Sequence, residues 1–229
     1  MQPYLFPYLG YFQLMNAVDE FVIYDNIQFS KKGWINRNRI LYSGKDIYIT
    51  APLKKDSDYL DVRDRWLAET WVKERGNMLN KITASYKRAP CFETVYPVIE
   101  KCILFEERNL FRFIFHSLTL LKKYLEIPTS FIISSTIDIE HNSKGQEKVI
   151  SICKERKAKT YINPIGGVGL YNKDAFKKEG INLEFLKTNE IIYPQFNNTF
   201  IPSLSIIDLM MFNTKNLIKD FLNDGFMIL

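Results

Sequence analysis

Short apolar runs alternate along this chain with longer segments of helical periodicity, and this alternation constrains its fold more than any other feature. Residues 21–24, FVIY, form a short run with β-branched residues at its centre, as expected of a buried strand. We interpret 160–164 and 181–187 as further strands, with helices between them. Strands that alternate with helices favour parallel pairing. We therefore expect an α/β fold with a Rossmann-like, mainly parallel sheet flanked by helices.

The middle of the chain departs from this alternation. Apolar residues recur every three or four positions within 63–86, 97–105 and 109–126, which predicts a helical insertion around residues 60–125. Before it, two strands around 37–42 and 46–53 are expected to join at the Ser43-Gly44 turn. After it, residues 130–139 alternate and predict another strand.

Several helix boundaries can be placed from capping residues. Ser143 with Gln146, and Ser205 with Asp208, have the spacing of capping boxes. Asn172 is expected to begin a short helix and Gly180 to end it. For Ser205 and Asp208 this spacing favours a structural role over a ligand contact.

Composition limits the function classes. The 229 residues suit a single domain over 1–229, and the formal charge of +5 is too small to predict DNA binding. Three cysteines and two histidines lack the spacing of disulfides or metal ligands, so no metal is indicated. We found no signal peptide and no apolar run that predicts a membrane span, and therefore expect a cytoplasmic protein.

Asp25 is the candidate catalytic residue because it ends a predicted strand, where open α/β sheets bind ligands. The loop that follows is rich in hydrogen-bond donors, with one aromatic ring for stacking. Its candidate substrate-binding residues are Gln28, Lys32, Trp34, Asn36 and Arg37. The alternative is a solvated loop in which Asp25 caps a turn.

Two further segments contain candidate binding residues. The opening segment QPYLFPYLGY contributes Gln2, Tyr8 and Gly10, although prolines and aromatics also make rigid packed turns. The glycine-rich segment after residue 163 contributes Asn163, Gly166 and Gly167, and it serves equally well as a structural turn. We expect the opening segment and the loop after Asp25 to converge on one polar cavity with aromatic walls.

The stretches QPYLFPYLGYFQLMNAVDEFVIYDNIQF, GWINRNRI, YINPIGG and LSIIDLMMFN resemble the WbqC-like proteins. The resemblance runs nearly end to end. Its motif falls on the following positions: Gln2, Pro3, Pro7, Gly10, Asp25, Gln28, Trp34, Asn36, Arg37, Asn163, Gly166 and Gly167. Members usually carry apolar residues before this motif, which implies that the first strand is truncated here.

The resemblance implies a role in bacterial surface-polysaccharide biosynthesis, such as that of O-antigen or capsule. Some members are described as glycine transferases. This implies an amino acid joined through an amide to the amino group of a nucleotide-linked amino sugar. The acyl donor would be a carrier-protein thioester, an aminoacyl-tRNA or an adenylate made from ATP, and the sequence does not choose among them. A non-catalytic nucleotide-sugar binding or assembly protein is the alternative, and a protein that contacts RNA is a third class.

Overall fold

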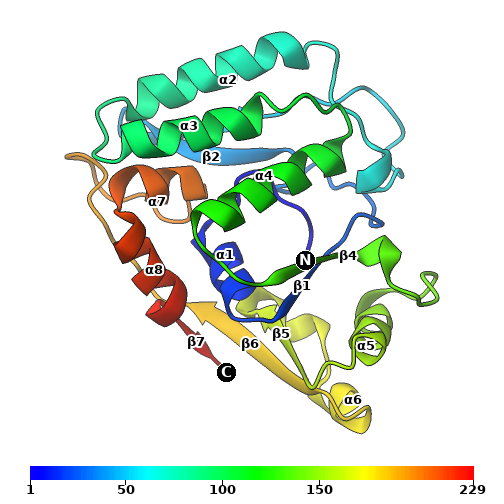
Figure 1. The fold of residues 1–229 in the computed structure, drawn as a ribbon. Helices are drawn as coiled ribbons and strands as arrows, with labels where there is room; N and C mark the ends of the chain where they lie inside the picture. Colours follow the sequence, from blue (N-terminus) through cyan, green and yellow to red (C-terminus); the bar gives the residue numbers. More distant parts are fainter.

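The computed structural model describes residues 1–229, and short parallel strand pairs make up one half of the molecule (Figure 1). Strand β1 (Glu20–Ile23) pairs in parallel with β4 (Ser130–Ile133). Strand β5 (Thr160–Pro164) pairs in parallel with β6 (Asn182–Thr188), and the short β7 (Phe226–Ile228) runs antiparallel along β6. The mixed α/β class predicted from the sequence is therefore confirmed.

A separate hairpin is formed by β2 (Arg37–Tyr42) and β3 (Lys45–Thr50). Its two turn residues, Ser43 and Gly44, have φ values of 48° and 76°. Two successive positive φ angles are typical of the type I′ turns that match the twist of a hairpin. The predicted Ser43-Gly44 connection is confirmed.

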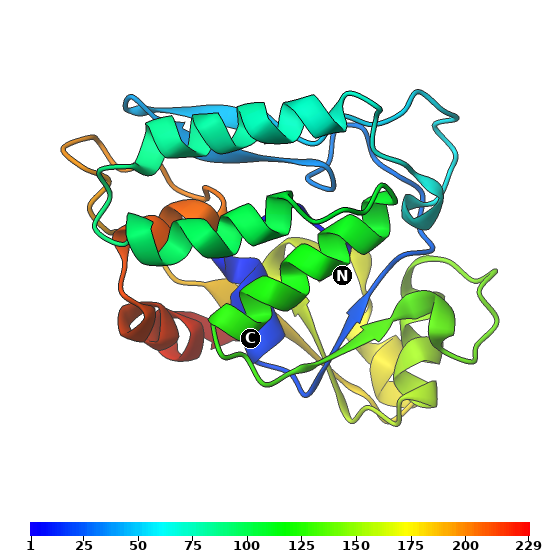
Figure 2. The same ribbon diagram turned by 45° about the horizontal axis from the view of Figure 1, so that its top comes forward.

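The predicted helical insertion is present as three helices that lie next to one another on the side of the molecule opposite α5 and α6 (Figures 1 and 2). They are α2 (Trp71–Tyr86), α3 (Phe92–Ile103) and α4 (Leu110–Tyr124). A single 3₁₀ turn, η1 (Val62–Asp64), precedes them. None of the helices is both long and apolar enough to cross a membrane.

The remaining helices are short, and their boundaries match the sequence only in part. They are α1 (Leu9–Asn16), η2 (Ser134–Thr136), α5 (Gly145–Glu155), η3 (Ile165–Leu170), α6 (Lys173–Lys178), α7 (Ile206–Phe212) and α8 (Lys215–Asp224). Asn172 caps α6 as predicted, because its side-chain oxygen accepts from the N–H groups of Asp174 and Ala175. The predicted box of Ser143 and Gln146 is wrong, since Gln146 instead accepts from the N–H of Asn172.

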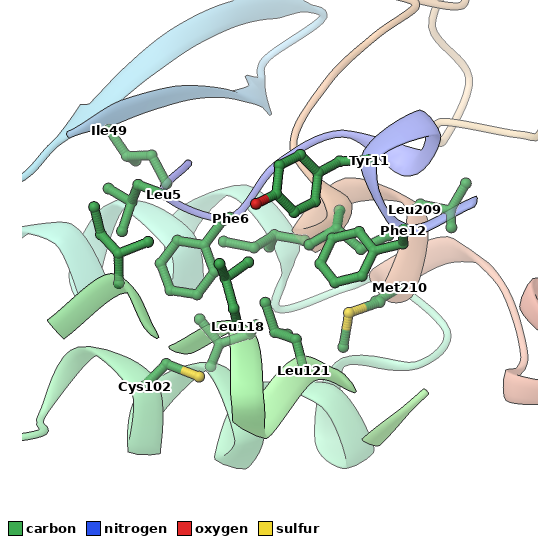
Figure 3. Close-up of a cluster of buried hydrophobic side chains, with 14 of the residues drawn as sticks. Leu5, Phe6, Tyr11, Phe12, Ile49, Cys102, Leu118, Leu121, Leu209 and Met210 are labelled. Carbon is green, nitrogen blue, oxygen red and sulfur yellow. The ribbon is translucent and has the colours of Figure 1, made fainter. Parts of the chain in front are cut away.

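The main hydrophobic core lies between the insertion, the opening segment and α7 (Figure 3). Leu5 and Phe6 are completely buried there, together with Leu118 of α4 and Met210 of α7. Phe12 of α1 occupies the same core. The opening segment is thus partly a structural element, and only some of its side chains are free to contact a ligand.

A single Rossmann-like sheet is not formed, because a groove of about 530 Å³ separates β1 from β5. Glu20, Phe21 and Val22 line one side of the groove, and Thr160, Tyr161 and Ile162 line the other. Helix α1 borders it through Leu14 and Ala17, and helix α5 through Val149, Ile152 and Cys153. The backbone edges of β1 and β5 that face the groove make no hydrogen bonds to each other.

The starts of the two strands beside this groove lie close together. Glu20 at the start of β1 forms an ion pair with Arg156, which precedes β5, at 2.6 Å. Met1 already occupies one position in the groove: its amine donates to the carbonyl of Val22, and its carbonyl accepts from the N–H of Tyr24. This is the hydrogen-bond pattern of one residue in a parallel ladder. The groove therefore has the form of a vacant parallel strand.

A buried polar network lies at the N-terminal half of α7. The spacing of Ser205 and Asp208 had predicted a capping box here. Ser205 does cap α7, through its Oγ, which accepts from the N–H of Ile207. Asp208 does not complete the box. Its buried carboxylate accepts hydrogen bonds from the hydroxyls of Tyr86 and Tyr193 and from the amide of Gln195, all at 2.7–2.8 Å. Burial raises the pKa of Asp208, although these three hydrogen bonds oppose the shift.

Five β-branched residues joined to Met1 should enter the groove as a strand between β1 and β5. We expect the free energy of unfolding to rise by about 2–4 kcal/mol, because added burial and ladder hydrogen bonds exceed the entropy cost of ordering the segment. Urea denaturation measures this gain. An extension of five alternating Gly and Ser residues is the control, and equal midpoints for the two extensions would contradict a strand-shaped groove.

The Met1 amine gives the unextended chain a distinct pH dependence. Burial lowers the pKa of this amine from 8.0 to about 5. The unfolded chain therefore binds more protons than the folded chain between these values, so stability should increase as the pH rises from 5 to 8. Denaturation curves across this range test the slope. The β-branched extension replaces the amine by a peptide N–H, and the part of the slope due to Met1 should disappear.

Replacing Asp208 by Ala should leave three buried donors without an acceptor. We expect the free energy of unfolding to fall by about 3 kcal/mol, since each unsatisfied buried group costs roughly 1–3 kcal/mol and the site can relax in part. Urea denaturation provides the measurement. Asp208→Asn, which keeps an acceptor oxygen, should lose less, and an equal loss in both variants would show that the hydrogen bonds do not matter.

Candidate functional site

The opening segment and the residues that enter β2 form a pocket of about 300 Å³, which we call the aromatic pocket. It is lined by Tyr4, Pro7, Tyr8, Trp34, Asn38, Arg39 and Ser203. Tyr8 and Trp34, two of the residues singled out from the sequence, thus share one cavity. Sequence reasoning did not select Asn38 or Ser203, because nothing in their local spacing distinguishes them from packed residues.

Cations and aromatic rings alternate along one wall of the aromatic pocket. The ring of Trp34 stacks on that of Tyr48, with centroids 6.2 Å apart and planes inclined by 18°. The Arg39 guanidinium lies 5.7 Å from the centre of the Trp34 ring, and its Nη1 is paired with Asp46 at 3.1 Å. Its Nε is buried and has no hydrogen-bond partner. The Arg39 side chain is 27% exposed, so a partly exposed guanidinium lies beside a planar stacking surface.

The loop that carries Tyr4 and Tyr8 is fixed by hydrogen bonds to distant parts of the chain. The N–H of Leu5 donates to the carbonyls of Trp34 and Ile35. The Asn38 amide donates to the carbonyls of Leu5 and Phe6, at 3.0 and 2.9 Å. Phe6 has a φ of 45°, a conformation uncommon for a bulky residue, which these bonds hold in place.

Gly10 acts on this pocket through packing. A Cβ atom at Gly10 would lie 2.5 Å from the ring of Tyr8 and 2.6 Å from the hydroxyl of Thr188. Such distances are not tolerated between real atoms, so only glycine lets the Tyr8 ring rest against the first turn of α1. The structure thus places Gly10 behind the pocket wall.

Asp25 lies outside the aromatic pocket, where the carboxyl ends of β1 and β4 meet. It is only 4% exposed. One carboxylate oxygen accepts from the backbone N–H of Ser135, and the other accepts from the Ser135 hydroxyl at 2.6 Å. Asp25 therefore joins the ends of two neighbouring parallel strands, as expected from its position, but it does not face Trp34.

A lysine that sequence reasoning missed lies near Asp25. Lys148 of α5 is 8% exposed, and its Nζ lies 5.6 Å from the centre of the Tyr24 ring. Burial lowers the pKa of Lys148, while the negative charges of Asp61 and Asp25 raise it. We call Tyr24, Asp25, Asp61 and Lys148 the strand-end cluster. The only sequence signal was a lysine four residues before Ile152, on the buried face of an amphipathic helix.

Asn163 and Gly167 adjoin this cluster at the end of β5. The Asn163 amide donates to the hydroxyl of Tyr161, and the hydroxyls of Tyr161 and Tyr171 are 3.4 Å apart. A Cβ at Gly167 would overlap the side-chain oxygen of Asn163, so the glycine is required by this contact. Gly166 faces open space. Tyr24 and Tyr161 line the same groove, so the start of β5 lies across from the end of β1.

The other predicted binding residues are occupied by local contacts. Arg37 donates to the carbonyls of Gly33 and Lys32, and so shapes the turn before β2. Gln28 donates to the carbonyl of Asp58, and Asn36 to that of Ala51. The Lys32 side chain is exposed.

Gln2 lies between the two regions. Its carbonyl accepts from the Tyr11 hydroxyl, and its side chain makes no hydrogen bond to the rest of the protein. Met1 is bonded to the end of β1, and Tyr4 lines the aromatic pocket. Three peptide units separate Met1 from Tyr4 and span at most about 11 Å, so the two regions lie close together along the backbone.

Comparisons with known proteins agree with the motif. Residues 2–220 match the model of the WbqC-like protein family. An uncharacterized protein of Mycobacterium tuberculosis strain H37Rv, Rv1507c, is 28% identical over 220 residues, which cover 94% of this chain and 93% of that protein. No solved structure matches. The match over nearly the whole length shows that this chain belongs to the WbqC-like protein family.

Proposed function

We propose that this protein is a transferase of bacterial surface-polysaccharide biosynthesis that joins an amino acid, through an amide, to the amino group of a nucleotide-linked amino sugar. The aromatic pocket is the observation that carries this proposal. It combines a stacked indole with a partly exposed guanidinium whose Nη2 makes no hydrogen bond within the protein. Nucleotide sugars offer a flat base for stacking and phosphate oxygens for such a donor.

The residues take specific roles in this proposal. Trp34 stacks on the base or sugar, and Tyr8 lines the same pocket. Arg39 replaces Arg37 and Lys32 as the phosphate contact, because Arg37 is bonded to backbone carbonyls. Gln2 offers a free amide between the pocket and the strand-end cluster, within reach of the sugar.

The proposed reaction is an acyl transfer. The neutral sugar amine attacks the acyl carbonyl, a carbon–nitrogen bond forms, and the bond from the carbonyl carbon to the donor's sulfur or oxygen breaks. The amine must lose a proton. Asp25 is the proposed base: its oxygens already accept from Ser135, but a carboxylate has about four lone-pair sites and can accept one more proton donor.

A second candidate is a nucleotide-sugar binding or assembly protein without catalysis. The two hydrogen bonds from Ser135 favour this alternative, because they already occupy both oxygens of the proposed base. In this case the aromatic pocket would still bind the nucleotide, and the strand-end cluster would only support the fold.

Binding to the pocket can be tested with Trp34→Ala. We expect the affinity for a nucleotide-linked amino sugar, measured by calorimetry, to fall roughly 10-fold or more, because base stacking contributes about 1–3 kcal/mol. Trp66→Ala is the matched control, since Trp66 is 47% exposed and lies outside the pocket. Equal affinity in the two variants would exclude the aromatic pocket as the nucleotide site.

Catalysis is tested by incubating the protein with nucleotide-linked amino sugars and, in parallel, glycine with ATP, a glycyl thioester or glycyl-tRNA. Mass spectrometry detects the aminoacylated sugar. Product with any donor, reduced in Asp25→Asn, supports the transferase. Binding without product under all three donors favours the non-catalytic alternative.

A further inference from the structure

The first turn of helix α7 is hydrogen-bonded to two walls of the aromatic pocket. The N–H of Ser205, which caps the helix, donates to the carbonyl of Arg39, and the N–H of Ile206 donates to that of Pro7. Pro7 and Arg39 both line the pocket. The Ser205 hydroxyl donates to the carbonyl of Phe6, the neighbour of Pro7. The first N–H groups of a helix have no partner within it, and here they join the opening segment to β2.

The segment that leads into α7 supplies a third part of the pocket wall. Ser203 lines the pocket and has a φ of 57°, a conformation uncommon for residues other than glycine. The side chain of Gln195 holds this segment, because it accepts from the N–H of Ile201 and donates to the carbonyl of the same residue. The Gln195 amide also donates to the carboxylate of Asp208. This part of the wall is thus attached to α7 as well.

Asp208 provides a second connection between α7 and β2. Its carboxylate is completely buried and accepts from the hydroxyls of Tyr86 and Tyr193, each at 2.8 Å. The Tyr86 hydroxyl in turn accepts from the N–H of Leu41, two residues beyond Arg39. Hydrogen bonds to a buried carboxylate are stronger than those between neutral groups. Strand β2 is therefore held directly at Arg39 and through Tyr86 at Leu41.

We propose that Ser205, Tyr86 and Asp208 are positioning residues that set the ligand affinity of the aromatic pocket. None of the three lines the pocket, so they act by fixing Pro7 and Arg39 relative to each other. Walls that are fixed before a ligand arrives need less ordering when it binds, which increases its affinity. The inference rests on the proposed function, because it takes this pocket as the nucleotide site.

Tyr86 and Tyr193 offer a matched pair of variants. Both hydroxyls donate to Asp208, but only that of Tyr86 also accepts from a strand of the pocket. We expect Tyr86→Phe to lower the affinity for uridine diphosphate glucosamine, measured by calorimetry, roughly 5-fold or more, and Tyr193→Phe to retain it. The measurements are made well below both melting temperatures, where a loss of stability alone leaves the affinity of the folded protein unchanged. Equal affinities in the two variants would overturn the proposal.

Ser205→Ala tests the contact with the opening segment. The carbonyl of Phe6 still accepts from the Asn38 amide in this variant, so it keeps a hydrogen-bond partner. The helix cap of α7 is lost, and Thr214→Ala is the control because it removes the cap of α8 outside the pocket. The affinity for the same nucleotide sugar should fall in Ser205→Ala alone. Retained affinity in Ser205→Ala, or an equal loss in Thr214→Ala, would also overturn the proposal.

A measurement without ligand separates the failure of this inference from that of the proposed function. The NMR signal of the Trp34 indole N–H reports the stacking of this ring on Tyr48. It should shift in Tyr86→Phe and Ser205→Ala, and keep its position in the two control variants. These shifts in a protein that binds no nucleotide sugar would keep the positioning role and exclude the proposed function. Nucleotide-sugar binding that is equal in all four variants would keep the function and exclude the positioning role.

Discussion

The attachment of the opening segment to two distant parts of the chain is the constraint on which the candidate site depends. Leu5 and Phe6 are core residues, while their neighbours Tyr4 and Tyr8 line the aromatic pocket. The Asn38 amide donates hydrogen bonds to the carbonyls of Leu5 and Phe6. The Ser205 hydroxyl also donates to the carbonyl of Phe6. Because this backbone is buried, each polar group needs a partner. The same bonds fix the positions of the two tyrosine rings.

This arrangement explains why core and site could not be separated in the sequence. The opening segment reads as one aromatic, proline-rich stretch, but its side chains alternate between the interior and the pocket. Convergence of Tyr8 with Trp34 could be predicted from the shared chemistry of the two segments. The location of Asp25 at a strand end could also be predicted. Its partner Ser135 could not, because it lies 110 residues further along the chain.

Local patterns predicted most of the fold, and long-range pairing accounts for the main errors. The insertion helices, the Ser43-Gly44 hairpin and the Asn172 cap follow from residues close in sequence. An apolar run predicts a strand but does not show which strand lies beside it. The sequence therefore could not show that a groove separates β1 from β5. Both predicted capping boxes are incomplete, because the side chains of Gln146 and Asp208 accept hydrogen bonds from residues distant in sequence. Lys148 was missed because a lysine on an amphipathic helix usually faces solvent.

The hydroxyl of Tyr86 connects the helical insertion to the aromatic pocket. It donates to Asp208 and accepts from the N–H of Leu41, two residues beyond Arg39 on β2. A shift of α2 along its axis would therefore move the strand that carries the pocket's arginine. Repacking of the insertion would therefore change the shape of the aromatic pocket with no substitution at any residue that lines it.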